Sequence, residues 1–128
     1  MSRLSWPKER RLLRRPQFTA CFERGVKHHC RYFIVFALRR DTTEPGIRLG
    51  LVVSRKVGPA VVRNRVKRVV REFFRLHQHE IDLPLDLVIV PKRRLDPGQL
   101  DITLAEEEFA PLLFRVREAA CKNSNERK

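Results

Sequence analysis

Residues 59–76, with the sequence PAVVRNRVKRVVREFFRL, contain six basic side chains and one acidic residue, Glu72. Like charges four residues apart on a helix repel each other by about 0.2–0.5 kcal/mol per pair, so helix surfaces usually mix both signs. Guanidinium groups pair with phosphate through two parallel hydrogen bonds. The stretch therefore predicts a phosphate-rich polyanion as its ligand, and the alternative is a basic surface that only water contacts.

Catalysis by side chains of this chain is not expected. A metal-dependent nuclease needs carboxylates that converge on Mg²⁺. The acids here stand at predicted turns, as Asp96 and Asp101 do, or at a predicted helix start, as Glu106 does. Ser54 has no indicated base beside it. We therefore predict no catalytic residue in the protein.

The cysteine pattern argues against a disulfide framework and against a structural zinc site. Cys21, Cys30 and Cys121 are odd in number, widely spaced and not arranged as a CxxC pair. His28 and His29 precede Cys30, but a second pair of ligands is missing. We expect buried thiols and no metal-binding residue.

The apolar residues of the basic stretch follow a helical spacing. At about 100° per residue they fall in one stripe, which predicts a face directed toward the core, with most of the charge on the opposite side. Gly58 precedes Pro59, whose fixed φ suits the first position of a helix. The predicted stripe consists of Val62, Val66, Val69, Phe73 and Leu76.

Composition limits the class of protein and of partner. The 128 residues favour one domain, and the net charge of +13 with a pI near 11.0 favours nucleic acid over an anionic membrane. The longest apolar run, residues 32–38, is far shorter than the roughly 20 residues of a membrane helix. We expect a soluble, cytoplasmic protein without a membrane partner.

Periodicity and turn residues predict an α+β fold. The expected order is a helix over residues 17–24, strands over 26–29, 32–39 and 47–54, the basic helix, a strand over 85–90 and a final helix from Thr103 to about Cys121. Thr103 and Glu106 would form its capping box, and Pro111 would kink it or delay its start. Residues 16–121 form the predicted domain and 122–128 a flexible tail. Residues 1–15 form a basic arm, either a solubilising tail or an extension that contacts RNA.

The motif RNRVKR in residues 63–68, preceded by LGLVVSRKVG in residues 49–58, resembles the protein subunit of bacterial ribonuclease P. The resemblance covers roughly residues 11–117: RRPQFTACFERG resembles the first helix of the family, and DLVIVPKR its last strand. WPKERRLL resembles proteobacterial members. The resemblance implies a ribosomal protein S5 domain 2-like fold, with four strands and three helices in α-β-β-β-α-β-α order. It also implies a left-handed crossover through the central helix, against the general preference for the right hand.

The resemblance further implies a non-catalytic subunit of a ribonucleoprotein endoribonuclease that removes 5′ leaders from precursor tRNA. Catalysis and Mg²⁺ would belong mainly to the RNA subunit, and no protein partner would be required. A cleft between the central helix and the sheet would receive the single-stranded leader. The implied contacts to the RNA subunit are Arg63, Asn64, Arg65, Lys67, Arg68 and Arg71. The implied leader contacts are Phe18, Phe22, Phe36, Arg55 and Lys56.

Two alternatives remain open from the sequence. A ribosomal-type RNA-binding assembly protein would carry the same basic helix, but it would show no preference for a precursor that bears a leader. The aromatic candidates could equally be core residues, because most phenylalanines are. A helix-turn-helix DNA reader is disfavoured, since strands flank the basic helix on both sides.

Overall fold

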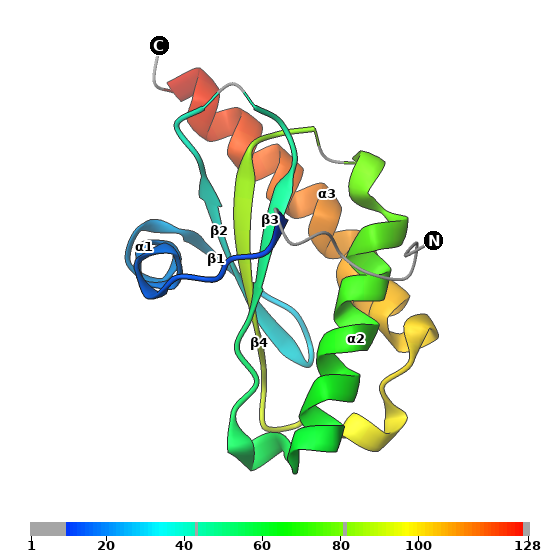
Figure 1. Cartoon of the computed structure of the whole chain (residues 1–128). Helices are drawn as coiled ribbons and strands as arrows, with labels where there is room; N and C mark the ends of the chain where they lie inside the picture. The colour runs from blue at the N-terminus through cyan, green and yellow to red at the C-terminus, as the bar shows by residue number, and fades with distance from the viewer. Residues whose placement is uncertain (1–9, 43, 81, 127–128) are drawn as a thin grey trace, which may run out of the picture.

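The computed structural model describes residues 10–42, 44–80 and 82–126, and it has three helices and one four-stranded mixed sheet (Figure 1). The predicted order of helices and strands is confirmed. The main elements are α1 (Arg15–Arg24), β1 (Val26–His29), β2 (Phe33–Arg39), β3 (Ile47–Leu51), α2 (Ala60–Leu76), β4 (Leu85–Pro91) and α3 (Ile102–Glu126).

The strands lie in the order β1-β2-β4-β3. β2 pairs antiparallel with β1 and with β4, while β3 and β4 are parallel neighbours. Parallel neighbours need a long crossover connection, and α2 with its flanking turns provides it. The connection that the resemblance implied is therefore present, and its expected left hand stays a prediction.

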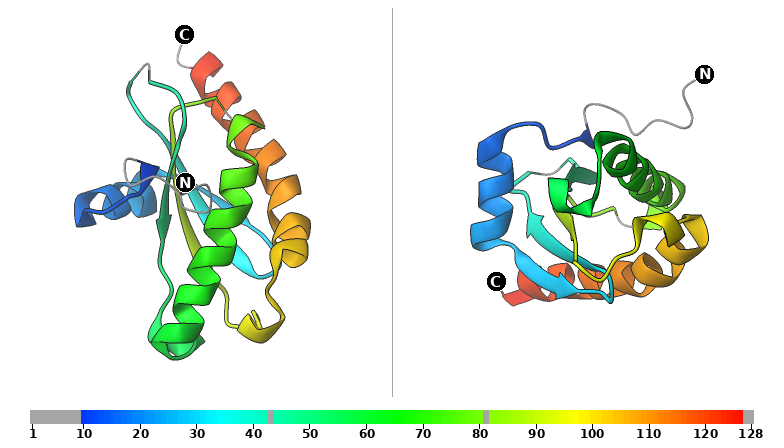
Figure 2. Two further views of the ribbon diagram at one scale, coloured as in Figure 1. Left: turned by 45° about the vertical axis from the view of Figure 1, so that its right-hand side comes forward. Right: turned by 90° about the horizontal axis from the view of Figure 1, so that it is seen from below.

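The sheet is covered by helices on both faces, with α2 and α3 on one side and α1 on the other (Figure 2). Side chains of a strand alternate between faces. Phe33 and Val35 accordingly join the larger core under α2 and α3, whereas Phe36 joins a smaller cluster under α1. The central strand β4 is buried without a break from Leu85 to Ile89, as expected for a strand covered on both faces.

The basic helix α2 begins at Ala60, and Pro59 is its N-cap rather than its first residue. Its fully buried residues are Val66, Val70, Phe73 and Phe74. The predicted stripe was therefore wrong at one end, because Leu76 is 50% exposed. Packing against the sheet and α3 selects the buried side of the helix, and that side is offset from the most regular apolar stripe.

The last helix, α3, begins at Ile102 and continues through Pro111, so the expected late start is wrong, and the expected kink stays a prediction. An interior proline costs a helix about 3 kcal/mol. Here the proline is on the exposed side, and burial of Phe109, Leu112 and Leu113 beside it holds the helix together. Residues 122–126, expected in a C-terminal tail, belong to this helix. Residues 127 and 128 lie outside the described residues.

The start of α3 is capped by a residue other than the predicted one. The Asp101 carboxylate accepts a hydrogen bond of 2.9 Å from the backbone N–H of Leu104. This is the usual geometry of an N-cap aspartate. The expected capping box between Thr103 and Glu106 is therefore wrong, and Glu106 bonds to His77 of the α2 end instead.

Part of the predicted arm belongs to the folded domain. Arg11 forms a parallel bridge with Leu49 of β3, and the Leu12 N–H donates to the Leu49 carbonyl at 2.9 Å. Leu12 is 4% exposed, and α1 already begins at Arg15. The segment therefore protects the edge of β3 from pairing with other chains. The rest of the predicted arm, residues 1–9, lies outside the described residues.

Candidate nucleic-acid interface

The cations of α2 point in three directions around the helix. At 100° per residue, Arg63, Lys67 and Arg71 lie on one flank, and Asn64 and Arg68 lie on the outer surface. Arg65 lies on the opposite flank, toward α3, where its guanidinium group contacts the loop before α3. Asn64 and Arg68 are exposed, and the others are partly buried. The six predicted RNA contacts therefore form a wide surface rather than a single row.

Two of these arginines already bond to carbonyl groups of the protein. Arg63 Nε donates to Gly58 O at 3.1 Å. Arg65 donates through Nη1 to Pro97 O at 2.6 Å and through Nη2 to Leu100 O at 2.7 Å. An arginine has five N–H donors. Arg63 therefore retains donors for an outside ligand, whereas both terminal nitrogens of Arg65 are engaged.

Glu72, the one acid of the helix, is paired with Arg75 and not with a predicted RNA contact. The two side chains form two parallel hydrogen bonds, of 2.9 Å from Nε and 2.6 Å from Nη2. The hydrogen bond from Arg75 lowers the pKa of Glu72. Within the described part of the chain, no ion pair involves any of the five α2 cations that were predicted to contact RNA.

Arg71 shows how strongly positive the flank is. Burial lowers the pKa of Arg71, and the nearby charge of Arg11 lowers it further. The N-terminal segment that lies along β3 thus places a second cation close to α2. Two guanidinium groups held near each other raise the local positive potential, which favours a polyanion at this flank.

Phe18, Phe22 and Phe36 gather on the α1 face of the sheet. The rings of Phe22 and Phe36 meet edge to face, with centroids 4.9 Å apart. Phe18 packs over Gly50, where an added Cβ would lie only 2.6 Å from Phe18 Cε1. Phe22 is 43% exposed, and Phe18 and Phe36 are partly buried. Aromatic rings that are held rigidly but remain accessible can stack against unpaired bases.

The cleft expected between the central helix and the sheet is not found beneath the body of α2 in the described residues. That space is filled by core residues, including Val66, Val70 and Phe73. The three aromatic candidates lie on the other face, because Phe36 is an even-numbered residue of β2 and points away from α2. Helix and strand patterns each identified a buried side, but they did not show which helix covers which face.

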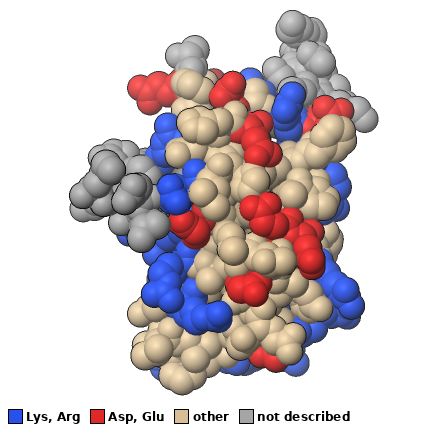
Figure 3. Space-filling model, turned by 90° about the vertical axis from the view of Figure 1, so that its right-hand side faces the viewer, with Lys and Arg blue, Asp and Glu red and all other residues tan. Residues whose placement is uncertain are grey.

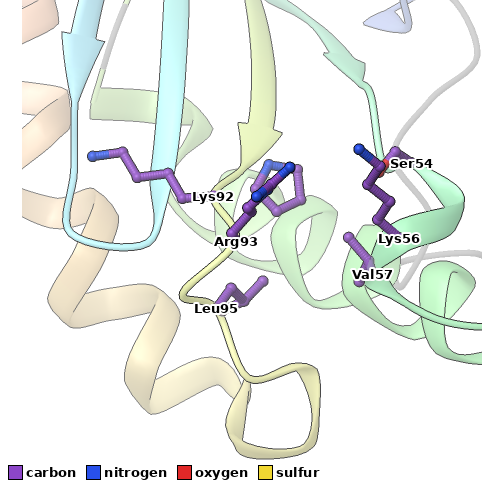
Figure 4. A pocket seen from close by; sticks show the side chains of 7 residues that line it. Ser54, Lys56, Val57, Lys92, Arg93 and Leu95 are labelled. Carbon is purple, nitrogen blue, oxygen red and sulfur yellow. The ribbon is translucent and has the colours of Figure 1, made fainter.

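A cleft of about 460 Å³ opens at the end of the sheet near the start of α2 (Figure 4). Ser54, Lys56 and Val57 line one side, and the segment after β4 lines the other with Lys92 and Arg93. Arg55 is exposed beside the cleft in the same short turn as Lys56 but does not line it. Lys92 and Arg93 were not among the predicted leader contacts, although a run of three cations directly after a buried strand was a usable signal.

The acids gather over α2 and α3 instead. Figure 3 shows this side of the molecule, with acidic side chains across its middle and basic ones at its margins. Glu72 and Glu106 belong here, since Glu72 lies by Ile102 of α3 and Glu106 bonds to His77. The charges are therefore largely segregated, and Arg68 lies where the two regions meet, since it lines the same hollow as Glu72 and Ile102.

Metal and thiol chemistry find little support in the described residues. No three His, Cys, Asp or Glu side chains converge there as a metal site would require. Cys21 and Cys30 are buried, as predicted, and burial raises the pKa of each thiol to about 11. Both thiols are therefore protonated and poorly nucleophilic near neutral pH. No helix of the described residues is long and apolar enough to cross a membrane.

Comparison with known proteins gives one family. The sequence model of the family Ribonuclease P matches residues 6–117. The ribonuclease P protein component of Maridesulfovibrio salexigens is 49% identical over 121 residues, which cover 94% of this chain and 98% of that protein. The ribonuclease P protein component of Oleidesulfovibrio alaskensis is 51% identical over 116 residues, which cover 91% of this chain and 93% of that protein. Both belong to the Desulfovibrionales, in agreement with the expected proteobacterial type.

Solved structures agree with the sequence comparison. The RNase P protein from Thermotoga maritima has a TM-score of 0.74 at 34% identity and covers 82% of this chain and 96% of that chain. The RNase P protein of Staphylococcus aureus has a TM-score of 0.73 at 25% identity and covers 84% of this chain and 95% of that chain. The chain therefore belongs to the ribonuclease P protein family, the protein component of a ribonucleoprotein endoribonuclease.

Proposed function

We propose that this protein binds two RNA elements at once, the catalytic RNA subunit through α2 and the 5′ leader of precursor tRNA through the α1 face and the adjoining cleft. The observation that carries the proposal is the charge arrangement of α2. Its one acid, Glu72, forms an ion pair with Arg75, and the five cations predicted to contact RNA have no ion-pair partner among the described acids. Except for Arg65, whose terminal nitrogens bond to Pro97 O and Leu100 O, those cations are held at a fixed spacing that phosphates can neutralise.

Binding to the RNA subunit would use the outer surface and one flank of α2. Asn64 and Arg68 are exposed, and Lys67 and Arg71 lie beside them. Each cation that contacts a phosphate releases condensed counterions, so affinity falls with salt. With about four phosphate contacts, from Arg63, Lys67, Arg68 and Arg71, the log–log slope of affinity against salt would be about −2.8 to −3.6.

Binding of the leader would combine stacking and charge. Phe22 and Phe36 offer ring surfaces on the α1 face, and Lys27 Nζ lies 5.8 Å from the Phe36 ring centroid. Lys56 and Arg93 add charge from the two sides of the cleft. A mature tRNA lacks the leader and would make none of these contacts, so the protein would favour the precursor over the product.

The chemistry of the cleavage would belong to the RNA. We propose that Mg²⁺ is held mainly by the RNA subunit and the substrate, and that the protein supplies no catalytic residue. The role of the protein in the reaction is then to screen the repulsion between two polyanions and to orient the precursor. No further protein partner is needed for this role, and we propose the cytoplasm as its site.

The experiment that tests the proposal is maturation of a precursor tRNA at low Mg²⁺ with the cognate catalytic RNA alone, the protein alone and both together. We expect cleavage by the pair and none by the protein alone. An Arg68→Gln variant should lower the activity of the pair at low Mg²⁺, with recovery at higher Mg²⁺.

Two results would contradict the proposal. Cleavage by the protein alone would show that a catalytic group in the protein has been overlooked. Equal affinity for precursor and mature tRNA, together with no stimulation of the RNA, would instead favour an RNA-binding assembly protein.

A further inference from the structure

Arg65 differs from the other cations of the basic helix in its surroundings. It lies on the α3 flank of α2, and its two terminal nitrogens donate to Pro97 O at 2.6 Å and Leu100 O at 2.7 Å. Hydrogen bonds from a charged donor are stronger than neutral ones, and a planar fork that meets two acceptors is fixed in orientation. Arg68, three residues later, is exposed instead.

The bonded carbonyls belong to the segment between β4 and α3. Leu95 and Leu100 of this segment are buried at 8% and 0% exposure, and a short 3-10 turn, Pro97–Gln99, lies between them. The start of the segment is held at Lys92, whose N–H donates to Tyr32 O at 2.8 Å and whose Nζ donates to Cys30 O at 2.6 Å. The turn itself has local bonds, such as Gln99 N–H to Asp96 O at 3.0 Å. The bonds to Arg65 connect this turn directly to α2.

The same segment forms one side of the cleft. Lys92, Arg93 and Leu95 line that side, while Lys56 and Val57, which lead into α2, line the other (Figure 4). A bond between α2 and the turn at Pro97 therefore ties together the two elements that continue from the two sides of the cleft.

We infer that Arg65 is a positioning residue, which ties the turn before α3 to α2 and so holds Arg93 across the cleft from Lys56, rather than contacting an RNA phosphate. The tie itself is a property of the free protein. Its effect on leader binding rests on the proposed function.

The first test uses the free protein and needs no RNA. Hydrogen exchange at the amides of Gln99 and Leu100 reports on the turn, because both amides bond within it. In Arg65→Gln we expect these amides to exchange about tenfold faster or more, since two charge-assisted bonds are lost. Arg68→Gln removes the same charge from the same helix and should leave both rates unchanged. Unchanged exchange in Arg65→Gln would overturn the inference.

The second test separates positioning from phosphate contact. Loss of one phosphate contact reduces the salt slope of RNA affinity by about 0.7 to 0.9. We expect this reduction for Arg68→Gln with the catalytic RNA but not for Arg65→Gln. Arg65→Gln should instead reduce the preference for precursor over mature tRNA. A reduced slope for Arg65→Gln, with an unchanged precursor preference, would overturn the inference.

A conservative variant covers the case in which Arg65→Gln does not fold. Arg65→Lys keeps the charge but has one nitrogen, so it cannot reach both carbonyls in the same geometry. In Arg65→Lys we expect the Leu100 amide to exchange faster than in the wild type, while the salt slope of RNA affinity stays at the wild-type value. An unchanged exchange rate in this variant would contradict the connection between Arg65 and the turn. If the wild-type protein itself shows neither a salt slope nor a precursor preference, the proposed function fails, and the exchange data still decide the role of Arg65.

Discussion

The two faces of the sheet use aromatic residues in different ways. On the face under α2 and α3, Phe33, Phe73 and Phe109 are 0% exposed and pack with one another. On the α1 face, Phe22 and Phe36 also meet, but Phe22 remains 43% exposed. One helix covers this face where two cover the other. The number of covering helices, rather than the residue type, decides which aromatic rings remain accessible to a ligand.

The largest effect is expected on the closed face. Phe109→Ala removes a fully buried ring that lies 4.9 Å from Phe33 and 5.4 Å from Phe73, measured between centroids. We expect a loss of about 3–5 kcal/mol in the free energy of unfolding, measured by urea denaturation. Phe22→Ala is the control and should cost about 1 kcal/mol or less. Equal losses would remove the distinction between the two faces.

The next effect concerns the buried charge under α1. Asp86 is 4% exposed and pairs with Arg48, at 2.8 Å, and with Arg40, at 2.9 Å. Asp86→Ala would leave both arginines without this partner, and we expect a loss of about 3 kcal/mol by the same measurement. Glu72→Ala removes an ion pair within one turn of a surface helix and should cost much less. A small loss at Asp86 would mean that water replaces the pair.

A smaller effect is expected on binding at the open face. Phe22→Leu keeps an apolar side chain but removes the ring, and base stacking on an aromatic ring contributes about 1–3 kcal/mol. We expect about tenfold weaker binding of precursor tRNA by the holoenzyme, with unchanged binding of mature tRNA. Leu13→Ala changes another exposed apolar residue, 60% exposed, and should have no effect. Equal weakening for both tRNAs would argue against a leader contact.

The smallest effect is a pH dependence at the closed face, where His77 joins α2 to α3. Burial lowers the pKa of His77, but hydrogen bonds to Glu106 and Glu80 outweigh it and raise the pKa above 6.5. A group whose pKa is higher in the folded than in the unfolded protein stabilises the fold when it is protonated. This stabilisation is complete below the pKa of the unfolded protein and is lost as the pH rises through the pKa of the folded protein. Both carboxylates are exposed, so the contribution is about 1 kcal/mol or less.

The measurement is the melting temperature of wild-type protein and of His77→Gln between pH 6 and pH 8.5. The wild type should lose more stability across this range than the variant does. Parallel curves for the two proteins would show that His77 does not carry the pH dependence.

Much of the fold could be predicted from local patterns. Alternation predicted β3, although the strand ends at Leu51 and not at Ser54, and residue type predicted β2 and β4. Helical spacing with Gly58 and Pro59 predicted α2 to within one residue at its start. Local patterns failed where packing overrides propensity. Pro111 remains within a continuous helix because its neighbours are buried, and Asp101 replaces the expected cap at the start of α3.

The sequence by itself determined the order of elements, the family and the charge of α2, because these follow from residue type and spacing along one segment. Only the tertiary structure decided that Phe22 of α1 meets Phe36 of β2, that Arg65 bonds to Pro97 and Leu100, and that Arg93 lies across a cleft from Lys56. These relations join residues far apart in the chain. Periodicity reports which side of an element is buried, but the partner on that side is set by how all the elements pack together.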